Sequence, residues 1–179
     1  MRINAGKYRN HNIEMTNLET TRETSDKVRQ AIFNLIGQFF DGEVVLDLFA
    51  GSGAMGLEAI SRGASKAYFN DINNKALDVV KRNALKLKAE DACEFSNKDY
   101  KDFLKAINKP FDIIFLDPPY KMNDIDEILA LIKEYKLLAP KGIIAFEMER
   151  QTNPESKYYQ IIKDRSYGIK RVVIYKEEI

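Results

Sequence analysis

Hydrophobic positions along the chain alternate between short continuous runs and a helical repeat. Continuous apolar runs with β-branched residues indicate buried strands, and apolar residues three or four positions apart indicate amphipathic helices. This rule predicts strands at Val44–Phe49, Lys66–Asn70, Cys93–Phe95, Phe111–Leu116 and Gly142–Met148. It predicts helices between them, at Met55–Ser61, Asn73–Lys88, Asp102–Ile107 and Ile125–Tyr135.

Different patterns flank this alternating region. Residues 1–23 are mixed and polar, which predicts an extended arm or a short hairpin. A helix is predicted from Thr24 or Ser25, either of which suits an N-cap, toward Phe40. Near the other end, Tyr159–Ile162 and Val172–Tyr175 are predicted to be two strands turned at Tyr167-Gly168. The apolar face of the first helix is predicted to consist of Val28, Ala31, Ile32, Leu35, Ile36 and Phe39.

Strands that alternate with helices over short links predict an α/β fold. The expected architecture is a doubly wound, mostly parallel sheet with helices on both faces. In such sheets ligands bind beyond the carboxyl ends of the strands, where the strand order reverses. A length of 179 residues is enough for one compact core. We therefore expect a single domain over residues 1–179, with residues 24–179 as its core.

The composition is that of an ordinary globular protein, with 45% hydrophobic and 31% charged residues. No apolar run is long enough to span a bilayer, and the first residues do not resemble a signal peptide. With Cys93 as the one cysteine and His11 as the one histidine, neither a disulfide framework nor a metal site is expected. The expected location is the cytoplasm, without a membrane partner.

The net charge of +1 does not by itself indicate a nucleic-acid partner. Basic residues are concentrated at both ends, however, and could form one phosphate-binding rim if the fold brings the ends together. Charge alone favours the simpler interpretation of two solvated surface segments. The basic residues of the two ends are Arg2, Lys7 and Arg9, and Lys157, Lys163, Arg165, Lys170, Arg171 and Lys176.

A glycine-rich segment leaves the first predicted strand and enters a helix. Gly51, Gly53 and Gly56 follow Asp47, and Asp71 ends the next predicted strand twenty residues after Gly51. Glycines allow a sharp turn and close backbone approach to a ligand, and the second acid can accept from ribose hydroxyls. Three interpretations compete here: a tight turn alone, a dinucleotide site, and a site for S-adenosylmethionine.

Asp47 distinguishes between the two ligands. A carboxylate on the strand before the glycines suits the ammonium group of S-adenosylmethionine, and it would repel a pyrophosphate. Asp47 could instead cap the helix or serve as a turn acid. Asp99, after the third strand, could accept from an adenine amino group or equally be the N-cap of the next helix.

The most informative segment is the strand Phe111–Leu116 and the Asp117-Pro118-Pro119-Tyr120 sequence after it. Prolines fix φ and donate no hydrogen bond, so this loop is expected to be rigid and to present carbonyls. The Asp117 carboxylate and the Pro118 carbonyl can each accept one N–H of an exocyclic amine. Tyr120 can stack on a base taken out of its helix. The alternative is a plain Pro-Pro turn, which the accompanying glycine loop and acids disfavour.

These residues resemble the class I methyltransferases, and Asp117–Tyr120 resembles the motif of amino-group methyltransferases. Over nearly its whole length the chain is similar to the bacterial 16S rRNA guanine-N2 methyltransferases, in a Gly6-Lys-Tyr-Arg9 arm, in residues 22–29, in Leu46–Ala64 and in the Asp-Pro-Pro-Tyr motif. The resemblance implies a seven-stranded Rossmann-like sheet and S-adenosylmethionine as cofactor. It implies methyl transfer to guanine N2 in 16S rRNA or the small ribosomal subunit. We expect a monomer.

The resemblance also implies roles for individual residues. The target amine is expected at the catalytic residues Asp117, Pro118, Pro119 and Tyr120. RNA contacts are expected at Arg2, Lys7, Arg9, Arg22 and Thr24. The cofactor contacts are expected at Asp47, Phe49, Gly51, Ser52, Gly53, Asp71, Ile72, Asp99 and Tyr100.

The chain departs from the family pattern in its arm and at one acid. The family usually has proline where Glu23 stands, glutamate where Asp71 stands, and a more basic arm where Asn10-His11-Asn12 stands. The main alternative activity is methylation of adenine N6 or cytosine N4, although no segment is large enough for a DNA target-recognition domain. A protein amide, a nicotinamide-dependent reaction and a non-catalytic RNA-binding module are further alternatives.

Overall fold

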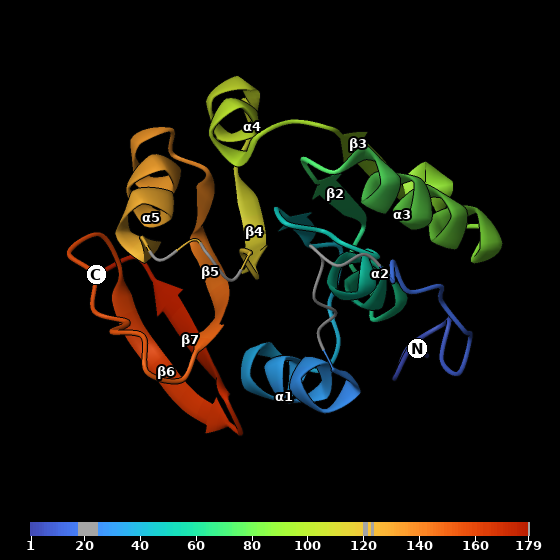
Figure 1. The fold of residues 1–179 in the computed structure, drawn as a ribbon, viewed down its shortest axis with the longest axis horizontal. Coiled ribbons are helices and arrows are strands. Elements are labelled where there is room, and N and C mark those ends of the chain that lie inside the picture. The colour runs from blue at the N-terminus through green and yellow to red at the C-terminus, as the bar shows by residue number, and fades with distance from the viewer. Residues whose placement is uncertain (18–24, 120–121, 123, 179) are drawn as a thin grey trace.

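A single seven-stranded sheet forms the centre of the protein (Figure 1). The computed structural model describes residues 1–17, 25–119, 122 and 124–178. The strand order is β3-β2-β1-β4-β5-β7-β6, and β7 runs antiparallel to both of its neighbours while the remaining pairs are parallel. The strands are β1 (Val44–Asp47), β2 (Lys66–Asn70), β3 (Cys93–Ser96), β4 (Phe111–Leu116), β5 (Leu138–Glu149), β6 (Gln160–Tyr167) and β7 (Lys170–Lys176).

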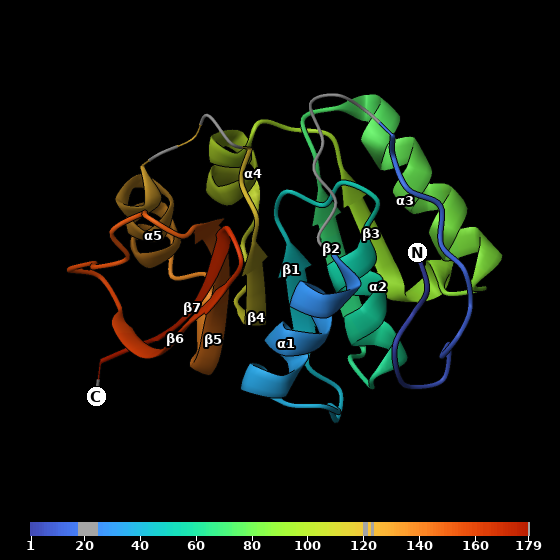
Figure 2. The ribbon, with the colours of Figure 1, turned by 60° about the horizontal axis from the view of Figure 1, so that its bottom comes forward.

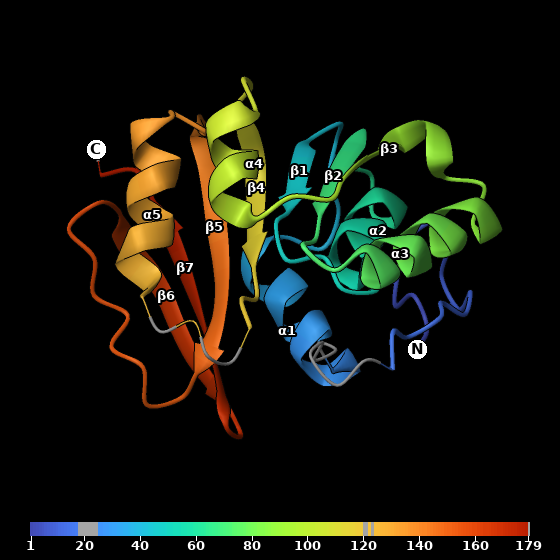
Figure 3. The same ribbon diagram turned by 45° about the horizontal axis from the view of Figure 1, so that its top comes forward.

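Helices cover both faces of the sheet (Figure 3), as the alternating pattern predicted. Apolar residues of α1, α2 and α3 form one core with one side of the strands, and those of α4 and α5 form a second core with the other side. The mostly parallel, doubly wound α/β prediction is therefore confirmed. The helices are α1 (Asp26–Ile36), α2 (Ala54–Ser61), α3 (Asn74–Lys86), the 3-10 turn η1 (Glu90–Ala92), α4 (Tyr100–Ala106) and α5 (Ile125–Glu134).

The first helix is shorter than its sequence pattern predicted. Ser25 caps α1 by accepting a hydrogen bond from the Val28 amide at 3.2 Å, and the helix ends at Ile36 because Gly37 leaves helical geometry with φ of 130°. Phe39 is consequently 67% exposed, so its predicted place on the apolar face is wrong. Beyond α1, the chain crosses to Arg62 at the end of α2, where the Phe40 amide donates to the Arg62 carbonyl.

The first thirteen residues form the predicted hairpin, with an antiparallel bridge between Arg2 and Asn12. Its turn lies against the last turn of α2, where the Lys7 amide donates to the Ser61 carbonyl at 2.9 Å. Gly6 makes this approach possible, because a Cβ there would lie 1.8 Å from the same carbonyl oxygen. Figure 2 shows the hairpin beside α2.

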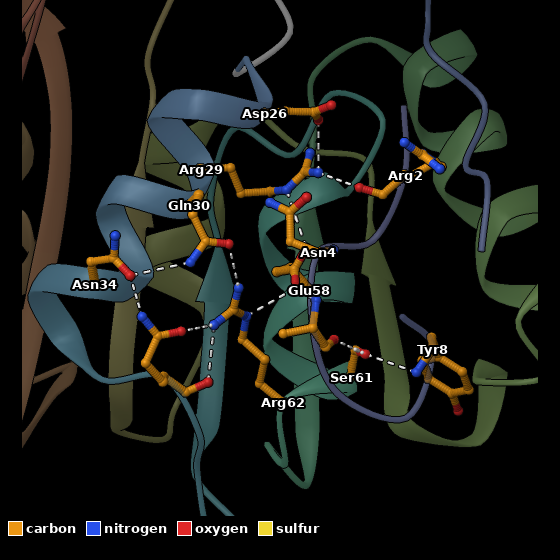
Figure 4. Close-up of polar contacts among 12 residues, drawn as sticks. Arg2, Asn4, Tyr8, Asp26, Arg29, Gln30, Asn34, Glu58, Ser61 and Arg62 are labelled. Carbon is orange, nitrogen blue, oxygen red and sulfur yellow. Dashed lines mark hydrogen bonds and ion pairs between the residues drawn. The ribbon is translucent and has the colours of Figure 1, made fainter. Parts of the chain in front are cut away.

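A buried ionic cluster fixes the hairpin to the domain (Figure 4). The Glu58 carboxylate of α2 lies between Arg29 at 3.2 Å and Arg62 at 2.9 Å, and all three side chains are fully buried. Glu58 also accepts the backbone amides of Asn4 at 2.8 Å and Ala5 at 3.1 Å. One carboxylate therefore joins the hairpin, α1 and α2.

The two basic ends of the chain do not form one rim. The hairpin lies beside α2 and α3, whereas β6 and β7 form the opposite side of the sheet (Figure 1). Arg171 is paired with Asp164 at 2.6 Å, and Lys163 donates to the Leu35 carbonyl of α1. The idea of a joint phosphate-binding rim is therefore wrong. Among the described residues, no helix has the length and apolar character needed to cross a membrane.

Candidate active site

A cavity of about 310 Å³ lies at the carboxyl edge of the sheet. It lies between β1 and β4. From β1 the chain continues through β2 to β3 on one side, and β4 and β5 follow on the other side of β1, so the strand order reverses at this point. The glycine turn and the Pro118–Pro119 turn line this one cavity from two strands. The predicted site residues among its lining are Phe49, Gly51, Asp71, Ile72, Asp99, Tyr100, Asp117, Pro118 and Pro119.

The three glycines of the loop serve different purposes. Gly51 lines the cavity and has a φ of 56°, a left-handed conformation that favours glycine. Gly53, with φ of 83°, begins α2, and a Cβ there would lie 2.7 Å from the Val80 side chain. At Gly56 a Cβ would lie 2.3 Å from the Phe69 ring. The second and third glycines are therefore required by packing between helix and sheet, and the first faces the cavity.

Asp71 connects the glycine turn to the second strand. Its carboxylate accepts the Gly51 amide at 2.9 Å through one oxygen and the Asn73 amide at 2.8 Å through the other. Each carboxylate oxygen has about two acceptor positions. A side chain held in this way can still accept hydroxyl groups of a ligand in the cavity, as a ribose requires.

The structure confirms the N-cap interpretation of Asp99, and its contact with an adenine amino group stays a prediction. Asp99 is the N-cap of α4, since its Oδ1 accepts the Lys101 amide at 2.9 Å, and it also lines the cavity. Next to it, burial raises the pKa of the Tyr100 phenol, with the Glu127 carboxylate as a second cause. Tyr100 therefore remains neutral, and its ring packs against that of Phe49 at 5.6 Å.

Asp47 does not line the cavity. It is 5% exposed, and its Oδ2 accepts the Gly56 amide in the first turn of α2 at 3.1 Å. Asp47 is not the N-cap of α2, which is Gly53, but its carboxylate binds a first-turn amide of this helix; its contact with the cofactor stays a prediction. Ser52 and Gly53 are likewise absent from the cavity lining, and the Ser52 carbonyl accepts from Asn83 at 2.9 Å.

The opposite wall is the turn that follows β4. Asp117 and Pro118 are half-buried and Pro119 is exposed. The Pro119 carbonyl accepts the Met122 amide at 2.9 Å, and both residues line the cavity. The predicted stacking residue Tyr120 lies outside the described residues, so its placement is untested.

Sequence reasoning missed several residues of the cavity. Asn70 ends β2 and holds the loop before α4, with its amide donating to the Lys98 carbonyl at 2.9 Å. A polar residue at a strand end was the available signal for it. Lys170 had no such signal, because the antiparallel register of β7 with β5 brings it to this edge. The missed cavity residues are Asn70, Asn73, Lys98, Met122 and Lys170.

The predicted RNA-contacting residues are not gathered around the cavity. Arg2, Lys7 and Arg9 are exposed on the hairpin. The hairpin turn contacts the end of α2 at Ser61, near the edge where the strands begin and opposite the cavity (Figure 2). Arg22 and Thr24 lie outside the described residues.

The cavity suits the chemical groups of S-adenosylmethionine. The carboxylates of Asp71 and Asp99 offer acceptors for ribose hydroxyls and an adenine amine, and Phe49, Ile72 and Tyr100 supply apolar surface for the purine. Ile72 lines the cavity and is 68% exposed, so its side chain is accessible to a ligand there. The fold and this site define a class I S-adenosylmethionine-dependent methyltransferase.

Comparison with known proteins identifies the family. Residues 1–176 match the family described as Conserved hypothetical protein 95, and the chain belongs to it. YlbH of Bacillus subtilis is 38% identical over 99% of both chains. Ribosomal RNA small subunit methyltransferase D of Haemophilus influenzae is 34% identical over 98% of this chain and 93% of its own.

Solved structures agree with this assignment. The structure of yhhF from Escherichia coli is 28% identical, covers 99% of this chain and 98% of its own, and superimposes with a TM-score of 0.87. An RNA methyltransferase of Salinibacter ruber in complex with S-adenosyl-L-homocysteine is 17% identical, covers 88% of this chain and 95% of its own, and has a TM-score of 0.66. The latter likeness concerns the fold alone.

Proposed function

We propose that this chain transfers a methyl group from S-adenosylmethionine to the exocyclic N2 of a guanine in 16S rRNA of the small ribosomal subunit. The observation that carries the proposal is the shared cavity, in which Asp117 and Pro118 face the same space as Gly51 and Asp71. The name of the Haemophilus influenzae relative supports ribosomal RNA of the small subunit as the substrate. The protein is proposed to act as a cytoplasmic monomer, and residues 1–179 are proposed to form one domain.

The residues around the glycine turn are assigned to the cofactor. Asp71 accepts the ribose hydroxyls and Asp99 the adenine amine, while Phe49, Ile72 and Tyr100 contact the purine. Gly51 and Ser52 bring the backbone close, and Gly53 allows the turn. The Asp47 carboxylate accepts the Gly56 amide and also contributes the negative charge that suits the ammonium group of the cofactor's amino-acid part.

The acceptor amine is assigned to the turn after β4. The cofactor supplies an activated methyl on a sulfonium, so the chain has to supply chiefly position and orientation. The Asp117 carboxylate and the Pro118 carbonyl each accept one N–H, which directs the nitrogen lone pair away from them and toward the cofactor side of the cavity. Pro119 stiffens the turn, and Tyr120 stacks on the base. After transfer, the extra proton leaves the nitrogen through Asp117 or water.

Contacts with RNA outside the target base are assigned to four basic residues and one threonine. Arg22 and Thr24 are assigned to RNA contacts, and Arg2, Lys7 and Arg9 contact phosphates at the hairpin. Because the hairpin turn lies toward the edge opposite the cavity, these contacts concern RNA remote from the target base.

The proposal is tested by offering tritiated cofactor to 16S rRNA, small subunits and duplex DNA from an unmodified source, followed by nucleoside analysis. We expect the label in N2-methylguanosine from the ribosomal RNA. Label in N6-methyladenosine or N4-methylcytidine, or in the DNA, would establish the alternative activity and overturn the proposal.

The same assay tests the acceptor role of Asp117. Asp117→Asn should lower the transfer rate by about 10-fold or more, because the uncharged amide oxygen of asparagine is a weaker acceptor of the amine N–H than the carboxylate, while affinity for S-adenosylhomocysteine changes little. The matched control is Asp91→Asn at an exposed position of η1, which should transfer at the parent rate. An Asp117→Asn variant as fast as the parent would contradict the role.

A further inference from the structure

Lys170 is the one basic residue of the described C-terminal strands that lines the cavity. It is the first residue of β7 and lies opposite Glu149 of β5 in the antiparallel register. Its Nζ is 3.5 Å from Glu149 Oε1 and 4.0 Å from Glu147 Oε1. The ammonium is thus held at the cavity by two carboxylates of the neighbouring strand.

These three charges are largely shielded from water. The exposed fractions of the side chains are 18% for Lys170, 5% for Glu147 and 21% for Glu149. Two carboxylates around one ammonium leave a local excess of negative charge, which repels a phosphate group. The cluster therefore suits a neutral ligand that carries both hydrogen-bond donors and an acceptor.

Lys170 lines the cavity together with the turn after β4, to which the target amine is assigned. A smaller cavity adjoins the large one and is lined by Glu147 and Glu149. Pro118, Pro119, Met122 and Lys170 line both cavities. Lys170 therefore lies between the glutamates and the turn to which the target amine is assigned.

We propose that Lys170 is a specificity-determining residue that donates a hydrogen bond to O6 of the target guanine, with Glu147 and Glu149 holding its ammonium in place. The inference rests on the proposed function. Along one edge guanine presents its N2 amine, then the N1–H donor, then the O6 acceptor. With the amine at Asp117 and Pro118, the glutamates offer an acceptor to N1–H and Lys170 a donor to O6. Adenine and cytosine instead carry a ring-nitrogen acceptor beside their amine.

The test compares two substrates that differ at position 6 of the target base and at N1, which is protonated in guanine and is a bare acceptor in diaminopurine. A 16S RNA assembled with a synthetic strand carries either guanosine or 2,6-diaminopurine riboside at the methylated position. Diaminopurine keeps the N2 amine, places an amine where O6 was, against the lysine, and lacks the N1–H assigned to the glutamates. The contribution of Lys170 is therefore measured by the difference in preference between the parent and Lys170→Met. The parent should prefer guanosine by on the order of 10- to 100-fold in kcat/KM, as expected for one hydrogen bond to a charged group. In Lys170→Met this preference should fall about tenfold or more.

Two further variants make the result specific. Lys170→Arg keeps a cation that can donate to O6. It should therefore retain the guanosine preference that Lys170→Met loses. Lys66→Met removes another strand lysine, paired with Glu94 at 2.9 Å at the amino end of β2, and should leave the preference unchanged.

The outcomes separate the two claims. If Lys170→Met binds S-adenosylhomocysteine like the parent and discriminates as well as the parent, the inference is wrong. If the parent forms no N2-methylguanosine at all, the proposed function fails, and the role of Lys170 fails with it.

Discussion

At the scale of single residues, three acids that the sequence predicted for the cofactor site hold backbone amides. Asp71 fixes the glycine turn through the Gly51 amide, Asp99 caps α4, and Asp47 accepts the Gly56 amide in the first turn of α2. A carboxylate already held by backbone amides loses little conformational freedom when a ligand arrives. Affinity for the cofactor should therefore depend on the charge and the fixed orientation of these side chains.

Asp71→Asn should weaken S-adenosylhomocysteine binding by about 10- to 100-fold, because hydrogen bonds to a charged acceptor are the stronger ones. Isothermal calorimetry measures the effect, with Asp91→Asn as the control for the same change at an exposed site. Unchanged affinity in Asp71→Asn would remove this residue from the cofactor site.

Residues at strand ends were predictable and residues placed by register were not. Asp71, Asp99 and Asp117 each follow a recognisable buried strand, so their convergence at one edge follows from parallel pairing. Lys170 reaches the same edge only because β7 runs antiparallel to β5 and pairs Lys170 with Glu149. Nothing local in the sequence specifies that register, which depends on tertiary pairing.

At the scale of elements, the length of a helix depended on one backbone conformation. The apolar pattern of the first helix continues to Phe39, but α1 ends at Ile36, because Gly37 turns the chain toward the end of α2. Periodicity reports which face a helix would bury and does not locate its end. The bounds of β2 and β4, in contrast, were predicted correctly.

The hairpin, α1 and α2 should depend on Glu58 as a unit. Glu58→Gln leaves Arg29 and Arg62 buried without their shared carboxylate, which should lower the free energy of unfolding by about 3–5 kcal/mol. Urea denaturation measures this loss. Glu90→Gln, an exposed change of the same kind, should have little effect. Equal stability of the two variants would show that the buried cluster does not hold these elements together.

At the scale of the whole molecule, the cavity and the hairpin turn lie toward opposite edges of the sheet (Figure 2). The basic segments at the two ends of the chain are separated by the sheet, which charge counts along a sequence could not reveal. Binding of the RNA body and binding of the target base are therefore expected to be separable.

Lys7→Ala combined with Arg9→Ala should raise the KM for ribosomal RNA and reduce the salt dependence of binding by about two charges, with kcat unchanged. The control pair, Lys105→Ala with Lys141→Ala, removes two exposed lysines elsewhere. A fall in kcat at constant KM would contradict the separation of the two binding regions.

The most direct test of the account is a crystal structure of the protein with S-adenosylhomocysteine. We predict that the ligand lies in the cavity, with its adenosine beside Asp71 and Asp99 and its sulfur facing Asp117 and Pro118. A ligand bound elsewhere, or one whose sulfur faces away from the turn after β4, would contradict the claim that these two loops form one methyl-transfer site.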